Sequence, residues 1–146
     1  MGYKEARGQV QSKMRPIILR RDGNKCIVCE NIEKLKICHV FPLAKMLKKR
    51  YRDWDWLNSE HNLVTLCERC HAIIDDRFSV LTDDPRVYKH IAPYHDLNDS
   101  RTWTISDRKR VKRVFEAERE RVLRIICEYL NIKYSTLKWH GGARYG

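Results

Sequence analysis

Two pairs of cysteines have the residue type and the spacing that bind a metal ion. Cys26 and Cys29 form one C-x-x-C pair, and Cys67 and Cys70 form a second. Four thiolates are the ligands of a closed tetrahedral zinc site, and a tight turn lets both sulfurs of a pair reach the same ion. The pairs therefore predict one structural Zn²⁺ site. Four unlinked buried thiols are a weaker interpretation, because two such pairs rarely arise by chance. A redox-active pair is also weaker, because the sequence lacks the βαβ pattern that it needs.

A second group of residues could carry acid–base or metal chemistry. His39 lies on a predicted strand, Asn62 lies directly before another, and His71 directly follows the second cysteine pair. An imidazole titrates near neutral pH, so His39 can be a free base there. Asp75 comes four residues after His71, which places both on one side of a helix where they can share one ion. Asp75 could equally be a solvated helix charge.

The order and spacing of these residues resemble those of the HNH endonuclease family, also called ββα-metal nucleases, in a cysteine-bearing branch. The resemblance covers about residues 13–78. Three stretches carry it jointly: RRDGNKCIVC (20–29), CHVFPL (38–43) and EHNLVTLCERCH (60–71). We therefore expect an α+β fold, with a small zinc-stabilised ββα-metal core, flanking helices and a long C-terminal helix.

The resemblance implies a metal-dependent DNA endonuclease. His39 matches the general base that takes a proton from water, and one divalent cation polarises the phosphate and stabilises the departing 3′ oxygen. That cation would be Mg²⁺, Mn²⁺ or another divalent ion, and the products would carry a 5′-phosphate and a 3′-hydroxyl. His71 matches a ligand of the cation. Asn62 matches a residue that ties the hairpin together and orients the catalytic histidine.

Cys38 departs from the family pattern. The residue before the general base is often Asp or His in the family and then binds the catalytic metal. A cysteine there could bind a softer ion such as zinc. It could instead be a small apolar filler that leaves the cation to His71, Asp75 and substrate oxygens. This departure keeps a second hypothesis open, a zinc-stabilised nucleic-acid-binding module without catalytic activity.

The distribution of charge favours a polyanionic partner. The net charge is +11, and it is uneven: residues 1–52 hold 14 basic and 4 acidic side chains, residues 53–105 hold 5 and 10, and residues 106–146 hold 11 and 5. Positive charge at both ends suits a surface that grips DNA. Contacts to backbone phosphates are expected from Arg20, Arg21, Lys45, Lys48, Lys49, Arg50, Arg52, Arg108, Arg110 and Lys112.

Two strands and a short helix must position the candidate site. The sequence predicts strands over residues 36–41 and 63–66, and a helix over residues 71–78. A helix over residues 12–22 precedes them, and a short basic helix over residues 43–51 lies between the strands. A long amphipathic helix follows, with Ser106 as its N-cap, a core thiol at Cys127 and an end near Leu130.

These elements predict four segments: an N-terminal arm (1–12), a zinc-stabilised nuclease core (13–80), an irregular connection (81–105), and a basic amphipathic helix with a tail (106–146). The last helix could pack on the core or pair with its copy in a homodimer. No apolar run approaches the roughly 20 residues of a membrane span, and residues 1–7 do not resemble a secretory signal. We expect a cytoplasmic protein of a bacterial, archaeal or phage-infected cell, with no membrane partner.

Overall fold

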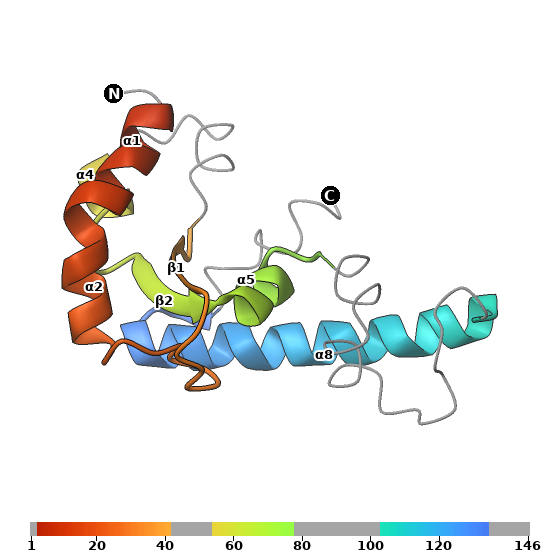
Figure 1. Cartoon of the computed structure of the whole chain (residues 1–146). Helices are drawn as coiled ribbons and strands as arrows, with labels where there is room; N and C mark the ends of the chain where they lie inside the picture. Colours follow the sequence, from red (N-terminus) through yellow and green to blue (C-terminus); the bar gives the residue numbers. More distant parts are fainter. Residues whose placement is uncertain (1–2, 42–53, 78–102, 135–146) are drawn as a thin grey trace.

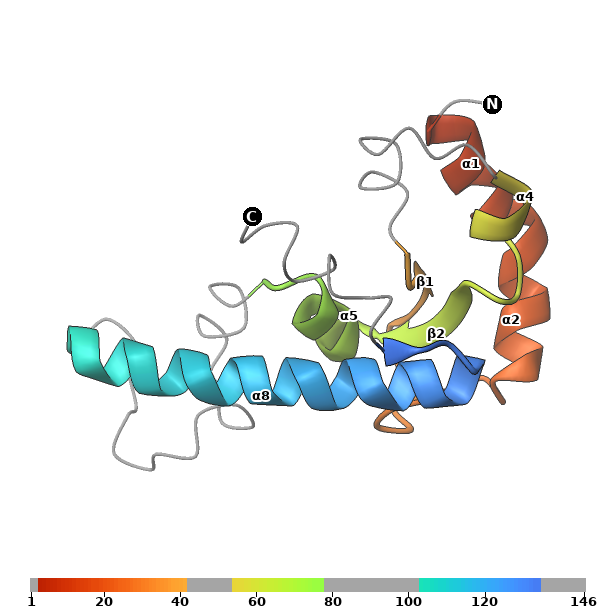
Figure 2. The same cartoon turned by 180° about the vertical axis from the view of Figure 1, so that it is seen from behind.

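The protein is a mixture of helices and one small two-stranded sheet, an α+β architecture (Figure 1). The computed structural model describes residues 3–41, 54–77 and 103–134. The predicted basic helix over 43–51, most of the predicted connection, and the C-terminal tail lie outside the described residues. The long helix α8 runs beneath the sheet and α5, and the N-terminal helices stand at one end of it (Figures 1 and 2).

The chain begins with three consecutive helical segments: α1 (Tyr3–Gln9), the π-helical segment η1 (Val10–Met14) and α2 (Arg15–Arg21). Pro16 lies in the first turn of α2, where a missing amide proton costs little. Gly23, with a φ of +73°, follows the end of α2. The predicted end of this helix is confirmed, but the helix starts inside the segment expected to be an arm. Ala6 and Val10 are buried, and this burial explains the longer helix.

The sheet pairs β1 (Leu35–His39) with β2 (Leu63–Cys67) in antiparallel register, with His39 opposite Leu63. Every residue of β2 is buried, because α2 packs against the strand and α5 follows directly from it. A strand covered in this way has a nearly continuous apolar sequence, and residues 63–66 fit this pattern apart from Thr65. Both predicted strands are confirmed, and β1 ends before Val40.

The short helix α5 (Glu68–Ile74) starts at the second cysteine pair. Cys67 is its N-cap, and the Cys67 sulfur accepts a hydrogen bond from the Cys70 amide at 3.5 Å. The helix therefore begins three residues before the predicted start at residue 71 and ends before Asp75. Ile73 and Ile74 are buried against α8.

The long helix α8 (Ile105–Leu130) is capped by Thr104, so the prediction of Ser106 as N-cap is wrong. The Thr104 hydroxyl accepts from the Asp107 amide, and the Asp107 carboxylate accepts from the Thr104 amide, which forms a capping box. Cys127 is buried as predicted. None of the described helices is long and apolar enough to cross a lipid bilayer.

Candidate functional site

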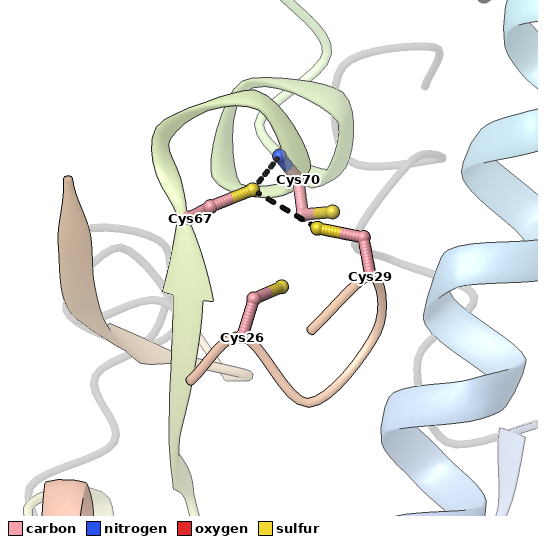
Figure 3. Close-up of side chains that lie close together, drawn as sticks. All are labelled: Cys26, Cys29, Cys67 and Cys70. Carbon is pink, nitrogen blue, oxygen red and sulfur yellow. Dashed lines mark hydrogen bonds between the residues drawn. The ribbon is translucent and has the colours of Figure 1, made fainter. Parts of the chain in front are cut away.

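The four cysteines of the two pairs come together in space. Their sulfur atoms all lie within 4.8 Å of one another, and Cys29 Sγ is 3.5 Å from Cys67 Sγ (Figure 3). Cys26, Cys67 and Cys70 are buried, whereas Cys29 reaches the surface. The cluster could hold a metal ion such as zinc, because four soft sulfur donors form the closed set that Zn²⁺ takes in structural sites.

Local backbone structure brings each pair into the cluster. The loop that carries Cys26 and Cys29 is closed by a bond from the Glu30 amide to the Cys26 carbonyl, at 2.9 Å. The Ile27 amide donates to the Thr65 carbonyl at 3.1 Å, which fastens this loop to β2. The second pair lies across the junction of β2 and α5, so the strand supplies one sulfur and the helix another (Figure 3).

The crowded sulfurs influence one another's protonation. Hydrogen bonds from Cys67 and Cys70 lower the pKa of Cys26, whereas the hydrogen bond with Cys26 raises the pKa of Cys67 to about 11. Hydrogen bonds with the same neighbours and burial raise the pKa of Cys70. One thiolate thus makes it harder for its neighbours to ionise. A divalent cation would remove this conflict by replacing the remaining thiol protons.

His39, the last residue of β1, is half-buried. Its Nε2 atom lies 2.8 Å from Oδ1 of Asn58. Burial lowers the pKa of His39 below its ordinary value, the hydrogen bond with Asn58 partly opposes this, and the positive charge of Arg7 lowers it further. His39 is therefore a neutral imidazole at neutral pH, the state in which it can accept a proton.

Asn62 is fully buried and lies at the end of the strand pair where the chain leaves β1 and enters β2. Its Oδ1 accepts from the Phe41 amide at 2.7 Å, and its Nδ2 donates to the carbonyls of Phe41 and Leu57 at 3.2 and 2.8 Å. The Asn62 carbonyl also accepts from the Val40 amide at 2.9 Å. Asn62 thus ties the chain leaving β1 to the chain entering β2, as the sequence predicts. A part for Asn62 in catalysis stays a prediction.

His71 forms a polar pair with Asp75 at the end of α5. His71 Nε2 is 3.1 Å from Asp75 Oδ2, and an Arg77 guanidinium nitrogen is 3.1 Å from His71 Nδ1. Because arginine only donates, Nδ1 is the acceptor and Nε2 carries the proton. Burial lowers the pKa of His71, the charge of Asp75 opposes this, and the charge of Arg77 adds to the lowering.

Cys38 is buried, and its Sγ donates to the Lys36 carbonyl at 3.7 Å. Burial, followed by the negative charge of Asp75, raises the pKa of Cys38 well above its ordinary value. Within the described residues, the four-cysteine cluster is the only set of three or more histidine, cysteine or acidic ligand atoms as close as 4.8 Å. The structure therefore pairs His71 with Asp75 but does not add Cys38 to a compact three-ligand set.

His39 and His71 share one electrostatic neighbour. The charge of Arg7 on α1 lowers the pKa of both imidazoles. The same positive charge therefore acts on both imidazoles, although they come from different elements. The N-terminal helix thus contributes a cation to the surroundings of both candidate residues.

The predicted DNA-contacting residues fall into four groups. Arg20 and Lys112 are exposed. Arg21 stabilises the fold, because its guanidinium donates hydrogen bonds to the carbonyls of Glu60 and Leu63 at 2.6 and 2.7 Å. Arg108 and Arg110 interact with their own helix end: Arg108 lies over the Trp103 ring and Arg110 pairs with Asp107 at 2.6 Å. Lys45, Lys48, Lys49, Arg50 and Arg52 lie outside the described residues.

Sequence reasoning missed Asn58, Arg7 and Arg77. Asn58 follows a short helical turn, α4 (Trp54–Leu57), and no motif marks it. Its partners are the Ala6 carbonyl and His39, which are far away along the chain.

Comparison with protein-family models, with curated proteins and with solved structures finds no match for this chain.

Proposed function

We propose that this protein is a metal-dependent DNA endonuclease of the HNH type, with His39 as its general base. The observation that carries the proposal is the arrangement where the chain leaves β1 and enters β2. Asn62 bridges these two segments, and His39 ends the strand beside it as a neutral imidazole. A nucleic-acid-binding module would need neither a neutral imidazole at this place nor a buried amide that orders the backbone around it.

The chemistry assigned to His39 is the removal of a proton from water. The ring is half-buried, which lowers its pKa, so the base is free at neutral pH. The resulting hydroxide attacks phosphorus, the bond to the 3′ oxygen breaks, and that oxygen takes up a proton from solvent water. This step leaves a 5′-phosphate and a 3′-hydroxyl.

The pair His71 and Asp75 fits a divalent cation, because a nitrogen and a carboxylate oxygen lie 3.1 Å apart on one helix end. The carboxylate suits Mg²⁺ or Mn²⁺, and the imidazole suits softer divalent ions such as Zn²⁺. A cation held there would polarise the phosphate and stabilise the leaving oxygen. To bind the ion, His71 would have to lose its Nε2 proton. Before the ion binds, the contact between that Nε2–H and Asp75 Oδ2 positions the ring.

The four-cysteine cluster is proposed as a structural zinc site that supports this centre. Cys70 directly precedes His71 on α5, and the first cysteine loop is fastened to β2 through Thr65. Zinc would thus hold the helix that carries His71 against the strand that follows Asn62. Substrate contact is assigned to the exposed Arg20 and Lys112 and to the basic residues 45–52.

The test is cleavage of supercoiled plasmid by zinc-loaded protein with added Mg²⁺ or Mn²⁺. We expect nicking by the wild type and a loss of about 100-fold or more in rate for His39→Ala, the scale of a general base. His61→Ala is the matched control, since His61 is exposed and one position from Asn62. Equal rates for all three proteins would refute the role of His39.

A catalytically inactive nucleic-acid-binding module is the second candidate, and one observation favours it. Cys38 is buried at a position where the family often has a metal ligand, and it forms no compact set with His71 and Asp75. If the wild type binds duplex DNA with steep salt dependence but cleaves none with any divalent ion, this second function replaces the first.

A further inference from the structure

Asn58 is a buried side chain, 7% exposed, that joins three elements. It follows α4, its Oδ1 lies 2.8 Å from His39 Nε2 at the end of β1, and its Nδ2 lies 2.9 Å from the Ala6 carbonyl oxygen on α1. Ala6 is itself fully buried and packs against Leu57. The position of Asn58 is therefore fixed from both sides.

The two contacts determine which way round the Asn58 amide lies. The Ala6 carbonyl can only accept a hydrogen bond, so the group that faces it must be the NH₂ of Asn58. The Oδ1 atom then faces His39, and this oxygen can only accept. His39 Nε2 must accordingly carry a hydrogen. Since a neutral imidazole has one N–H, Nδ1 is left with the free lone pair.

Asn62 cannot take over this task. Its NH₂ group donates to Phe41 and Leu57, and its Oδ1 accepts from the Phe41 amide. The amide that orders the hairpin and the amide that contacts the imidazole are thus different residues, four positions apart. Each has its own set of partners.

We propose that Asn58, anchored by the Ala6 carbonyl, is a positioning residue that holds His39 in the tautomer with the proton on Nε2, so that Nδ1 is the atom that takes the proton from water. The consequence for cleavage rests on the proposed nuclease function, whereas the tautomer is a property of the folded protein. The N-terminal helix α1 is therefore part of the support of the site, because the Ala6 carbonyl orients the Asn58 amide.

The test reads the two ring nitrogens of His39 by ¹⁵N NMR in the full, zinc-loaded chain, at a pH where the ring is neutral. We expect a protonated Nε2 and an unprotonated Nδ1 in the wild type. Asn58→Leu removes the acceptor at similar volume and should give a mixture of tautomers. Asn58→Asp retains an oxygen acceptor for Nε2 but loses the donor to the Ala6 carbonyl, and its negative charge raises the pKa of His39. It should keep the wild-type tautomer at a pH where the ring is neutral. Asn31→Leu, in an exposed loop, is the matched control and should change nothing.

Cleavage kinetics supply the second measurement. Asn58→Leu should lower kcat by about tenfold or more, the scale seen when a group that orients a functional histidine is removed, with little change in KM. A protonated Nδ1 in the wild type, or an unchanged tautomer in folded Asn58→Leu, would overturn the inference. If Asn58→Leu does not fold, the wild-type and Asn58→Asp spectra still decide it. A wild type that has the expected tautomer but cleaves no DNA would refute the nuclease proposal alone.

Discussion

Asn62 uses both the donors and the acceptor of its side-chain amide inside the protein. Three backbone groups, the amide and carbonyl of Phe41 and the carbonyl of Leu57, depend on it. A buried backbone group that loses its partner costs the full penalty of desolvation. At the scale of single residues, Asn62 therefore affects stability as well as the proposed chemistry.

Asn62→Ala should lower the free energy of unfolding by about 2–4 kcal/mol, because it leaves buried backbone groups without partners. Urea unfolding of the zinc-loaded protein measures this. Asn31→Ala removes an exposed side-chain amide that accepts from the Glu33 amide, and it should change the free energy of unfolding by no more than about 0.5 kcal/mol. Equal losses in the two variants would show that the amide of Asn62 does not support the hairpin.

The sequence predicts single site residues where a motif marks them. The cysteine pairs are confirmed as a cluster. Asn62 bonds to the backbone of Leu57 and Phe41, and His71 contacts Asp75, but their roles in catalysis and metal binding stay predictions. Asn58 could not be predicted, because its role depends on a carbonyl of a helix far away in the sequence. The orientation of a side-chain amide is decided by tertiary contacts, which spacing along the chain does not reveal.

At the scale of elements, Asp22 joins α2, β2 and α8. The buried carboxylate accepts from Arg21 Nε at 2.7 Å, from the Thr65 amide at 2.8 Å and from the Tyr129 hydroxyl. Burial raises the pKa of Asp22, but hydrogen bonds from Arg21, Tyr129 and Thr65 outweigh burial and hold the pKa below its ordinary value. The ionised form is therefore the one that the fold stabilises.

Asp22→Asn should destabilise the protein by about 2–3 kcal/mol at neutral pH, because an amide cannot accept all three bonds. A pKa that is lower in the folded state than in the unfolded state contributes stability above the unfolded value, near pH 4, and loses it as pH falls through the folded value. The stability difference between wild type and Asp22→Asn should therefore narrow as pH falls below about 4.

Chemical unfolding of both proteins across the acid range measures this difference. Any acid sensitivity of the cysteine cluster is the same in the wild type and in Asp22→Asn, so it cancels when their free energies of unfolding are subtracted. Tyr129→Phe removes one of the bonds and should cost about 0.5–1.5 kcal/mol. A difference between wild type and Asp22→Asn that stays constant down to low pH would contradict the account of Asp22.

The sequence predicts the interiors of the helices and strands better than it predicts the residues at which they begin. The apolar residues at 17–19 predict α2, whereas α1 is largely polar and is held by Ala6 and Val10, which pack against other elements. Thr104 rather than Ser106 caps α8, because Asp107 completes the capping box three residues after Thr104. Local sequence offers both caps, and the reciprocal bond decides between them.

At the scale of the whole molecule, three of the four clustered cysteines belong to the largest hydrophobic core among the described residues. Cys26, Cys67 and Cys70 pack in one cluster with residues of α8 such as Phe115 and Ile126. A metal ion held by the four sulfurs would therefore fix the first cysteine loop, the sheet and α5 in one unit against the long helix. Its binding free energy would add to the stability of the fold.

Purified protein should contain one zinc ion per chain, and Cys70→Ser should lose both the zinc and the cooperative thermal unfolding transition. Cys127→Ser is the matched control, since Cys127 is buried on α8 outside the cluster, and it should keep its zinc. Because zinc must displace thiol protons, its apparent affinity should tighten by about tenfold per pH unit for each proton displaced between about pH 6 and pH 8. Equal zinc content in both variants, or an affinity independent of pH, would refute the site.

The central claim is that His39 and a divalent cation together hydrolyse a DNA phosphodiester. The most direct measurement is the initial rate of plasmid nicking by zinc-loaded protein as the Mn²⁺ concentration is raised, for wild type and for His39→Ala. We expect a wild-type rate that rises with Mn²⁺ concentration and then saturates. We expect the His39→Ala rate to be lower than the wild-type rate by about 100-fold or more at every concentration. A wild-type rate that is independent of added Mn²⁺, or that His39→Ala reproduces, would contradict it.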